Sequence, residues 1–348
     1  MEENKRKGKR VKTERTGSVR VNSLDAQFDR FYHAKSAENV TDRTLQSYRE
    51  NYGYFCEYLD LKGIIRDVRN VNQDVIRRYI VWMRREKVRY ENCGKFAPEY
   101  VKTKGLKPTT VNLRLKTLKT MFRFLTKDGV VLKNPFTDLK KVEEDDEGKK
   151  IMTTEELRTL LDTPNRQHYT GFRDITLMCA LIDGFMRISE ALAIRKSDID
   201  FNAGVIMLRA STTKGRKTRV IPLQKETVRM LRELIKENED FDSDLVFLTY
   251  YGDNFTANAF RQRIRKYVKK AGLNVRVHPH LFRHTAATMA LDNGMGIRHL
   301  QEILGHKDLR VIQQYTHLST QSLKKQHDQY SPLNDVIRKA NKPRKVLR

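Results

Sequence analysis

The sequence predicts a mainly α-helical protein with a small antiparallel β-sheet, divided into two folded domains. Apolar residues follow a helical period over 22–140 and again from 225 to about 330. Only residues 204–223, GVIMLRASTTKGRKTRVIPL, show the alternation of two short strands, joined by a Lys-Gly turn. The charged run KKVEEDDEGKK, residues 140–150, is typical of an interdomain linker.

The first domain, residues 22–139, is expected to be helical. Thr41 is a good N-cap for one amphipathic helix, and Pro108 suits the first turn of a later one, where its missing N–H costs nothing. Three apolar faces are predicted: Leu45, Tyr48, Tyr52, Phe55 and Leu59; Val75, Ile76, Tyr79, Ile80 and Met83; and Val111, Leu115, Leu118, Phe122 and Leu125.

Other segments flank and follow this domain. Residues 1–21 are predicted to be a disordered basic arm, because they contain many Lys and Arg and almost no large apolar residue. After the linker, a capping box of Thr153 and Glu156 marks the start of a larger α+β domain over 151–330. Residues 331–348 form a C-terminal segment with a basic tail.

The composition indicates a polyanionic partner. The 348 residues include 69 Lys and Arg against 43 Asp and Glu, a net charge of +26. Nucleic acid is the first candidate and an anionic membrane the second, but there is neither a signal peptide nor an apolar run of about 18 residues. Three widely spaced cysteines, Cys56, Cys93 and Cys179, indicate a reducing cytoplasm. Four cations off the last apolar face are expected to contact DNA: Arg114, Lys116, Lys119 and Arg123.

Four separate stretches hold the residue types that phosphate transfer requires. Two arginines can clamp a phosphodiester, a lysine at a hairpin tip can reach a leaving oxygen, and a histidine can move a proton near neutral pH. A tyrosine can be the nucleophile that stores the phosphate as an ester. Singly, each would more often be a solvated or packed residue. The stretches are RISE with Arg187 and Glu190, TTKGRK with Lys214, HPHLFRHT with His280 and Arg283, and LGHKDLRVIQQY with His306 and Tyr315.

The crowded histidines also raise the possibility of zinc. No cysteine lies nearby, and the spacing of His278, His280 and His284, which starts at a proline, does not give the helical geometry of a zinc site. We therefore expect no metal here.

In this order, the motifs R-I-S-E-A-L, T-K-G-x-K-x-R-x-I-P-L, H-x-x-R-H-T and L-G-H followed by a tyrosine resemble the tyrosine recombinase (phage integrase) family. The resemblance covers residues 151–320 and extends more loosely to 22–139, which looks like the family's helical, SAM-like core-binding domain. It implies a catalytic α+β domain in which His284 is structural and His278 has no assigned role. The implied site consists of Arg187 and Arg283 as phosphate clamps, Glu190 as their brace, Lys214 as general acid for the 5′ oxygen, His280 as proton handler, His306 as a phosphate ligand and Tyr315 as nucleophile.

The chain departs from the family pattern at one position. The family usually has a glycine two residues before the first arginine, whereas this sequence has Phe185 there and Gly184 one residue earlier. The departure predicts a rearranged entry into the helix that follows.

The resemblance implies site-specific recombination through a 3′-phosphotyrosine intermediate and a Holliday junction, with four protomers on two duplexes. Each step exchanges one phosphodiester for another, so neither ATP nor a metal cofactor is expected. A type IB topoisomerase and a DNA-binding regulator with a vestigial site are the rival interpretations. The core-binding domain argues against the first and the complete set of catalytic residue types against the second.

The biological role follows less directly. The short basic arm favours a Xer-like plan without a separate arm-binding domain, while the basic tails and a long basic loop over 87–107 are additions to that plan. We expect integration, excision or transposition of a mobile element. The alternative is resolution of chromosome or plasmid dimers, and accessory proteins are possible in either case.

The C-terminal segment carries a small apolar face. Leu333, Val336 and Ile337 are spaced i, i+3 and i+4, too few to form a core of their own. They can dock on the same protomer or, as the family resemblance favours, on a neighbouring protomer.

Overall fold

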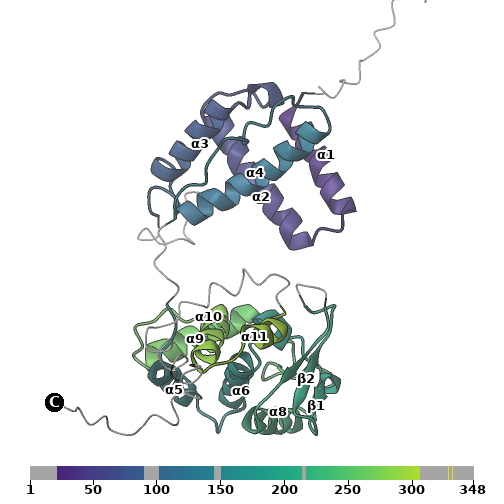
Figure 1. Ribbon diagram of the computed structural model, residues 1–348, viewed down its shortest axis with the longest axis vertical. Helices are drawn as coiled ribbons and strands as arrows, with labels where there is room; N and C mark the ends of the chain where they lie inside the picture. The colour runs from purple at the N-terminus through teal and green to yellow at the C-terminus, as the bar shows by residue number, and fades with distance from the viewer. Residues whose placement is uncertain are drawn as a thin grey trace, which may run out of the picture. The chain divides into compact units, whose positions relative to one another are not determined.

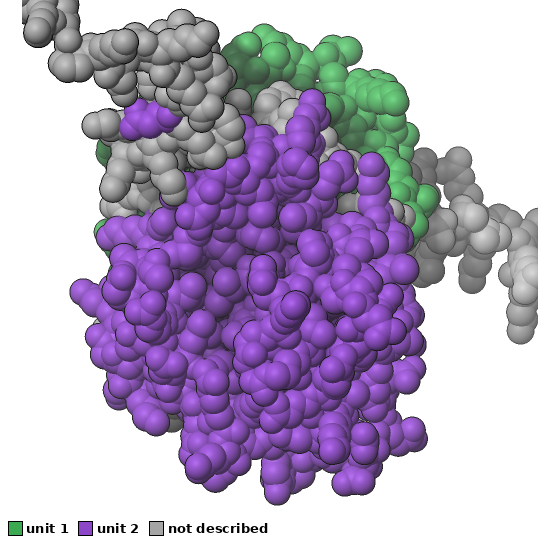
Figure 2. All heavy atoms as spheres, turned by 60° about the horizontal axis from the view of Figure 1, so that its bottom comes forward, with its two compact units in different colours: residues 1–147 green, residues 148–348 purple. Residues whose placement is uncertain are grey.

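The chain forms two compact units, residues 1–147 and 148–348, which Figure 2 shows in different colours. The division falls inside the stretch 140–150 that the composition marks as a linker. The structure is a computed structural model, and it describes residues 22–89, 102–144, 150–213 and 217–305, with 328 and 331. No helix in these ranges is long and apolar enough to cross a membrane.

The described part of unit 1 is helical, as predicted (Figure 1). Its helices begin where local chemistry favours a start. The Asn72 side chain accepts hydrogen bonds from two backbone amides at one helix start, and Pro108 occupies the first turn of another. Buried aromatic rings, among them Phe55 and Tyr79, fill the space between the helices. The elements are α1 (Leu24–Ala37), α2 (Asp42–Leu61), the 3-10 turn η1 (Val68–Asn70), α3 (Gln73–Arg85) and α4 (Pro108–Lys127).

Helix α4 contacts the other three helices, and one expectation about it is wrong. Arg114, predicted to lie off the apolar face, is only 8% exposed. Its guanidinium carbon lies 3.5 Å from the centroid of the Tyr54 ring, so an aromatic face rather than solvent holds this cation. Lys116, Lys119 and Arg123 are exposed, as expected.

Unit 2 is built around one central helix, α6 (Tyr169–Asp183). This helix is buried on nearly every side, and it contacts α8 and α10. The predicted capping box of Thr153 and Glu156 is present at the start of α5. The other helical elements are α5 (Thr154–Asp162), α7 (Ile188–Ala191), the 3-10 turn η4 (Lys196–Asp198), α8 (Lys225–Glu237), α9 (Ala257–Lys270), α10 (Pro279–Asp292) and α11 (Ile297–Leu304).

In the described part of unit 2, the sheet has three antiparallel strands in the order β1-β2-β3, one more than predicted. Strands β2 and β3 form the predicted hairpin and pair Leu208 with Arg219. The additional strand β1 is two residues long, too short to show an alternating pattern in the sequence. Strand β3 also contacts α11, which brings the hairpin to the helix before the L-G-H motif. The bounds are β1 (Ile199–Asp200), β2 (Val205–Leu208) and β3 (Arg219–Pro222).

Candidate active site

The connection from α6 to α7 positions the first candidate arginine. Helix α6 ends at Gly184, and Phe185 follows with a φ of 49°, in the left-handed region that glycine adopts readily. Phe185 stands where the family usually has glycine, so the backbone conformation typical of glycine is present although the glycine is not. Arg187 then has an extended backbone, with φ −75° and ψ 147°, and is the N-cap of α7.

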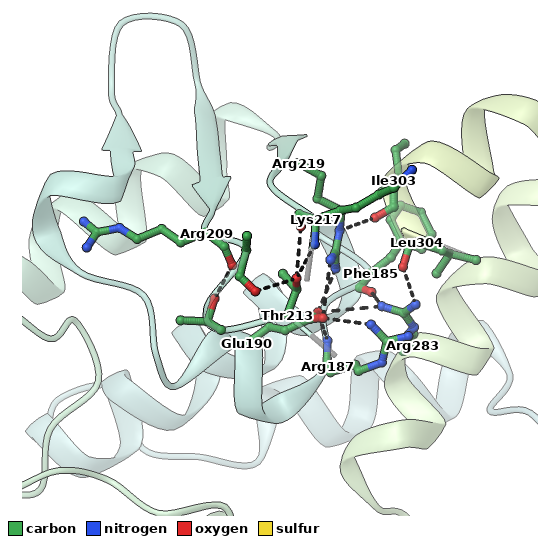
Figure 3. Close-up of polar contacts among 12 residues, drawn as sticks. Phe185, Arg187, Glu190, Arg209, Thr213, Lys217, Arg219, Arg283, Ile303 and Leu304 are labelled. Carbon is green, nitrogen blue, oxygen red and sulfur yellow. Dashed lines mark hydrogen bonds and ion pairs between the residues drawn. The ribbon is translucent and has the colours of Figure 1, made fainter. Parts of the chain in front are cut away.

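Glu190 lies at the centre of the site, with a side chain that is 0% exposed. The backbone N–H of Arg187 donates to Glu190 Oε2 at 2.9 Å, and Arg187 Nη1 donates to Oε1 at 2.8 Å. From β3, Arg219 Nη2 donates to Oε2 at 2.7 Å and Nη1 donates to Oε1 at 3.3 Å. From α10, Arg283 Nη1 lies 3.9 Å from Oε2. We call these four residues the Glu190 cluster; Figure 3 shows the three arginines converging on the carboxylate.

Arg283 is held by two backbone carbonyls as well as by its position near Glu190. Its Nη1 donates to the Phe185 carbonyl at 2.5 Å and its Nη2 donates to the Leu304 carbonyl at 2.8 Å. Its side chain is only 5% exposed. One carbonyl belongs to the left-handed turn before α7 and the other to the last residue of α11, so two separate elements fix the orientation of this guanidinium.

The sequence analysis assigned Arg187, Glu190 and Arg283 but missed Arg219. The arginine was visible as the R of T-K-G-x-K-x-R, yet in so basic a chain it could not be told from a solvated surface residue. Its signal was periodicity: Arg219 lies two residues before Ile221, which is buried, so both side chains point to the inner face of the sheet.

The electrostatics of the Glu190 cluster favour anion binding. Burial alone would raise the pKa of Glu190, but hydrogen bonds from Arg219 and Arg187 outweigh burial and hold that pKa below its usual range. Glu190 is therefore charged at neutral pH, and one negative charge meets three arginines. Arg187, whose side chain is 21% exposed, presents part of the remaining positive charge to solvent. A phosphodiester is the kind of anion that such a guanidinium binds well.

Two histidines at the start of α10 have different roles. His278 is the N-cap, and its Nδ1 accepts a hydrogen bond from the backbone N–H of Leu281 at 3.2 Å. The family resemblance assigns no role to His278, although a polar residue before a proline at the first helical position is a capping signal. The pKa of His280 is lowered by partial burial and then by the charges of His278, Arg283 and Arg187. His280 is therefore neutral near pH 7 and able to accept a proton.

The last two residues of the H-x-x-R-H-T motif, His284 and Thr285, lie within α10. His284 lies inside α10, where its carbonyl accepts a hydrogen bond from Thr288 Oγ1 at 3.0 Å. Thr285 is 1% exposed, and its Oγ1 accepts from the backbone N–H of Met152 at 3.1 Å, which ties the start of unit 2 to α10. Within the described ranges, no group of three or more His, Cys, Asp or Glu is placed to hold a metal ion.

The base of the β2–β3 loop is closed by one buried threonine. Thr213 Oγ1 accepts from the backbone N–H of Lys217 at 3.1 Å and donates to the Lys217 carbonyl at 3.0 Å. The predicted general acid, Lys214, follows Thr213 directly in the sequence. Three predicted catalytic residues lie outside the described part of the chain, so their roles stay predictions: Lys214, His306 and Tyr315.

Sequence comparisons match both units. The profile described as "Phage integrase family" matches residues 150–322, and that described as "Phage integrase SAM-like domain" matches 24–142. The chain is 30% identical over 320 residues to the tyrosine recombinase XerC of Oceanobacillus iheyensis, which covers 90% of this chain and 98% of that protein. This chain belongs to the tyrosine recombinase (phage integrase) family. The tyrosine recombinase XerC of Chlamydia caviae is 31% identical over 227 residues, 64% of this chain and 72% of that one.

A solved structure shows that this tyrosine recombinase also shares the fold of the family. The Tn1549 transposon integrase, in complex with a circular intermediate DNA, matches with a TM-score of 0.69 at 20% identity, covering 88% of this chain and 99% of that one. The predicted fold, a helical SAM-like core-binding domain and a mainly helical catalytic domain with a small antiparallel sheet, is confirmed.

Proposed function

We propose that this tyrosine recombinase cleaves and rejoins double-stranded DNA at a specific site on behalf of a mobile element. The observation that carries the proposal is the Glu190 cluster, in which Arg187 and Arg283 come from different helical elements and are held by protein acceptors, Arg187 by Glu190 and Arg283 by two backbone carbonyls. Cations preorganised in this way stabilise the charge that develops on a phosphate in the transition state. The net charge of +26 supplies general affinity for DNA.

The reaction proceeds in two exchanges of one phosphodiester for another. The Tyr315 hydroxyl attacks the scissile phosphorus and gives its proton to His280. A 3′-phosphotyrosine forms as the bond between phosphorus and the 5′ oxygen breaks. Lys214 donates a proton to the departing 5′ oxygen. The 5′-hydroxyl of a partner strand then attacks the phosphotyrosine and releases the tyrosine. The phosphate oxygens are held by Arg187, Arg283 and His306.

Assembly follows the plan that the family resemblance implies. Four protomers hold two duplexes and exchange strands in two rounds through a Holliday junction. The apolar face of Leu333, Val336 and Ile337, which lies outside the described part of the chain, docks in this proposal on the neighbouring protomer and links the subunits.

Two biological roles compete, and we favour the first. The basic segments at both ends, and the fold shared with an integrase that serves the Tn1549 transposon, favour a mobile element. The XerC of Oceanobacillus iheyensis, which matches over 98% of its own length, favours resolution of chromosome or plasmid dimers as the second candidate.

The nucleophile is tested by removing one hydroxyl. Tyr315→Phe should still fold and bind DNA but form no covalent adduct that resists SDS, because no oxygen is left to attack phosphorus. Tyr330→Phe is the matched control and should form adducts like the parent. Adducts that persist in Tyr315→Phe and vanish in Tyr330→Phe would assign the reaction to the other tyrosine.

The role is tested by mapping covalent attachment. The full chain is incubated with DNA from its own genomic neighbourhood, and the DNA that ends at the phosphate joined to the protein is sequenced. Attachment at the two ends of a discrete segment supports the mobile element. Attachment at one chromosomal or plasmid site outside any such segment supports dimer resolution, and no attachment anywhere contradicts the recombinase activity.

A further inference from the structure

We infer that Arg219 is a positioning residue for DNA cleavage, which sets the placement of Arg187 through Glu190 and fixes the end of α11. The inference rests on the proposed function, since it names a residue that makes the proposed phosphate site work. Neither the resemblance nor the sequence analysis assigned Arg219 a role.

Arg219 first acts on the carboxylate. Its Nη2 and Nη1 both donate to Glu190, at 2.7 and 3.3 Å, in the side-by-side arrangement that a guanidinium makes with a carboxylate. Arg187 makes one side-chain hydrogen bond to the same carboxylate, through Nη1. Without Arg219, the buried charge of Glu190 would be balanced mainly by Arg187, which would be drawn towards it. Arg219 therefore leaves Arg187 available to an incoming phosphate.

Arg219 also holds the end of α11. Its Nε donates to the Ile303 carbonyl at 2.9 Å. Its guanidinium and Cδ lie over Gly305, where a Cβ would come within 3.1 Å of both Cδ and Nη1. Gly305 has a φ of 64°, ends α11 in the left-handed conformation and immediately precedes His306 in the chain. One side chain thus joins β3, α7 and α11 (Figure 3).

Arg219 is not itself placed to bind phosphate. All three of its guanidinium nitrogens already donate to protein acceptors. A phosphate would have to displace Glu190 or the Ile303 carbonyl to reach it, and a buried acceptor left unpaired is costly. Arg219 therefore acts through other residues.

Arg209 provides a matched control from the same hairpin. It follows β2 directly, but it donates through Nε to Asp198 at 2.5 Å and through Nη2 to Ser197 at 3.1 Å. Figure 3 shows its side chain pointing away from the Glu190 cluster. Arg209→Ala therefore removes the same charge and a comparable ion pair from the same hairpin without touching the site.

The first measurement needs no DNA. Hydrogen exchange is followed in the full chain for the backbone amides of residues 301–305. Arg219→Ala should speed their exchange about tenfold, since the end of α11 loses a side-chain anchor, while Arg209→Ala should leave it unchanged. Unchanged exchange in Arg219→Ala, or equal acceleration in both variants, overturns the proposed contact with α11.

The second measurement follows cleavage in a single turnover on a nicked duplex that carries the mapped site. At saturating DNA, Arg219→Ala should form adduct roughly 100-fold more slowly, as a misplaced clamp would, while the DNA concentration for half-saturation stays within about twofold. Arg219→Lys should recover only part of the rate, because an ammonium does not reproduce the planar fork. A defect that appears only as weaker DNA binding overturns the positioning role.

A substrate with a neutral methylphosphonate at the scissile position separates positioning from folding. This group needs less positive charge in the transition state, so the defect of Arg219→Ala should shrink if it arises from misplaced arginines. An equal defect on both substrates overturns the route through Arg187.

If the parent chain forms no adduct but exchange responds to Arg219 alone, the recombinase proposal fails and the structural contact stands. If the parent and all variants cleave alike, the Arg219 proposal fails and the function stands.

Discussion

Glu190 is the residue on which the geometry of the site most depends. Its side chain is 0% exposed, and Arg187 and Arg219 hold four hydrogen bonds to it: one from a backbone amide and three from guanidinium nitrogens. Removing either the buried carboxylate or one of its arginine partners leaves a buried charge without compensation, which destabilises the folded state.

Replacing Glu190 with glutamine should therefore destabilise the protein as well as the site. Removing one member of a buried ion-pair cluster costs about 3 kcal/mol or more, because the remaining charges stay buried without compensation. Denaturant unfolding measures the loss, and Glu226→Gln, which breaks an exposed pair with Arg229, is the control that should change little. Equal stabilities of the two variants would contradict the importance of burial.

The same carboxylate makes stability depend on pH. The folded pKa of Glu190 lies below its ordinary value of 4.5, so its contribution is present above that value and is lost as pH falls through the folded pKa. Glu190→Gln should remove this component. The difference in unfolding free energy between parent and variant should therefore narrow as the pH is lowered below 4.5, which unfolding curves at a series of pH values would show.

Single residues also show where sequence reasoning reaches its limit. Arg187, Glu190 and Arg283 were predicted together because each lies in a short motif, and the structure brings them into one cluster. Arg219 and Arg114 could not be resolved in the same way. In a chain with 69 Lys and Arg, charge alone does not distinguish a buried cation from a solvated one; only the partner, Glu190 or the Tyr54 ring, does so.

At the scale of elements, the turn between α6 and α7 combines backbone strain with packing. A left-handed φ costs a residue with a side chain about 1 kcal/mol or more. At Phe185 the ring offsets part of this cost by packing against a small apolar cluster from α10 and α11. The cluster contains Ala287, Leu291, Leu300 and Leu304.

Glycine and alanine at position 185 should separate these two effects. Both lose the ring, but only Phe185→Ala keeps the strain, so Phe185→Gly should be the more stable of the two by about 1 kcal/mol. Ser189, an exposed position in α7, is the control. There the alanine variant should be more stable than the glycine variant, as is usual in a helix. Thermal unfolding of the four variants tests this, and alanine preferred at both positions would contradict the strain.

Helix α4 carries the exposed Lys116 and Lys119 and the buried Arg114, and we expect only the two lysines to contact DNA. If Lys116 and Lys119 contact phosphates, the double variant Lys116→Gln/Lys119→Gln should reduce the slope of log affinity against log salt by about two units, because each lost contact removes about 0.9. Arg114→Leu is the internal contrast. It should lower stability by losing the stack on Tyr54 and leave the salt slope unchanged.

The measurement is DNA binding at several salt concentrations for all three proteins. A slope unchanged in the double lysine variant places those residues away from DNA. A smaller slope in Arg114→Leu would mean that this arginine leaves Tyr54 to reach DNA.

Elements with strong local signals were predicted well, and short ones were not. The capping box at Thr153 and the proline start at Pro108 mark α5 and α4 correctly, because caps act within one turn of helix. The strand β1, two residues long, forms only because β2 lies beside it. Tertiary pairing of this kind leaves no local pattern to detect.

At the scale of the whole molecule, we expect the C-terminal segment to stabilise the assembly of protomers on two duplexes. Truncation after Gln329 removes Leu333, Val336 and Ile337, whose partial burial in a neighbour would contribute a few kcal/mol, since full burial of one such side chain contributes on the order of 1.5 to 3 kcal/mol. Single-site binding should persist, while assembly of complexes that join two duplexes should weaken. Native gel electrophoresis with one and with two labelled duplexes measures both.

The contrary result is equally clear. If the shortened chain joins duplexes and exchanges strands like the full chain, the segment docks on its own protomer or on nothing. Leu333→Ser/Val336→Ser/Ile337→Ser keeps the chain length and the basic tail, so it separates loss of the apolar face from loss of charge.

The Glu190 cluster also limits how this sequence can drift over generations. Three arginines share one carboxylate, so replacing any one of the four residues alone should leave the others with unbalanced charge and reduce stability or activity. A lineage that loses the carboxylate keeps a surplus of buried positive charge, and one that loses Arg219 frees that carboxylate to capture Arg187. Related sequences should therefore either keep all four residues or replace several of them together. These four residues are therefore expected to vary together rather than one at a time.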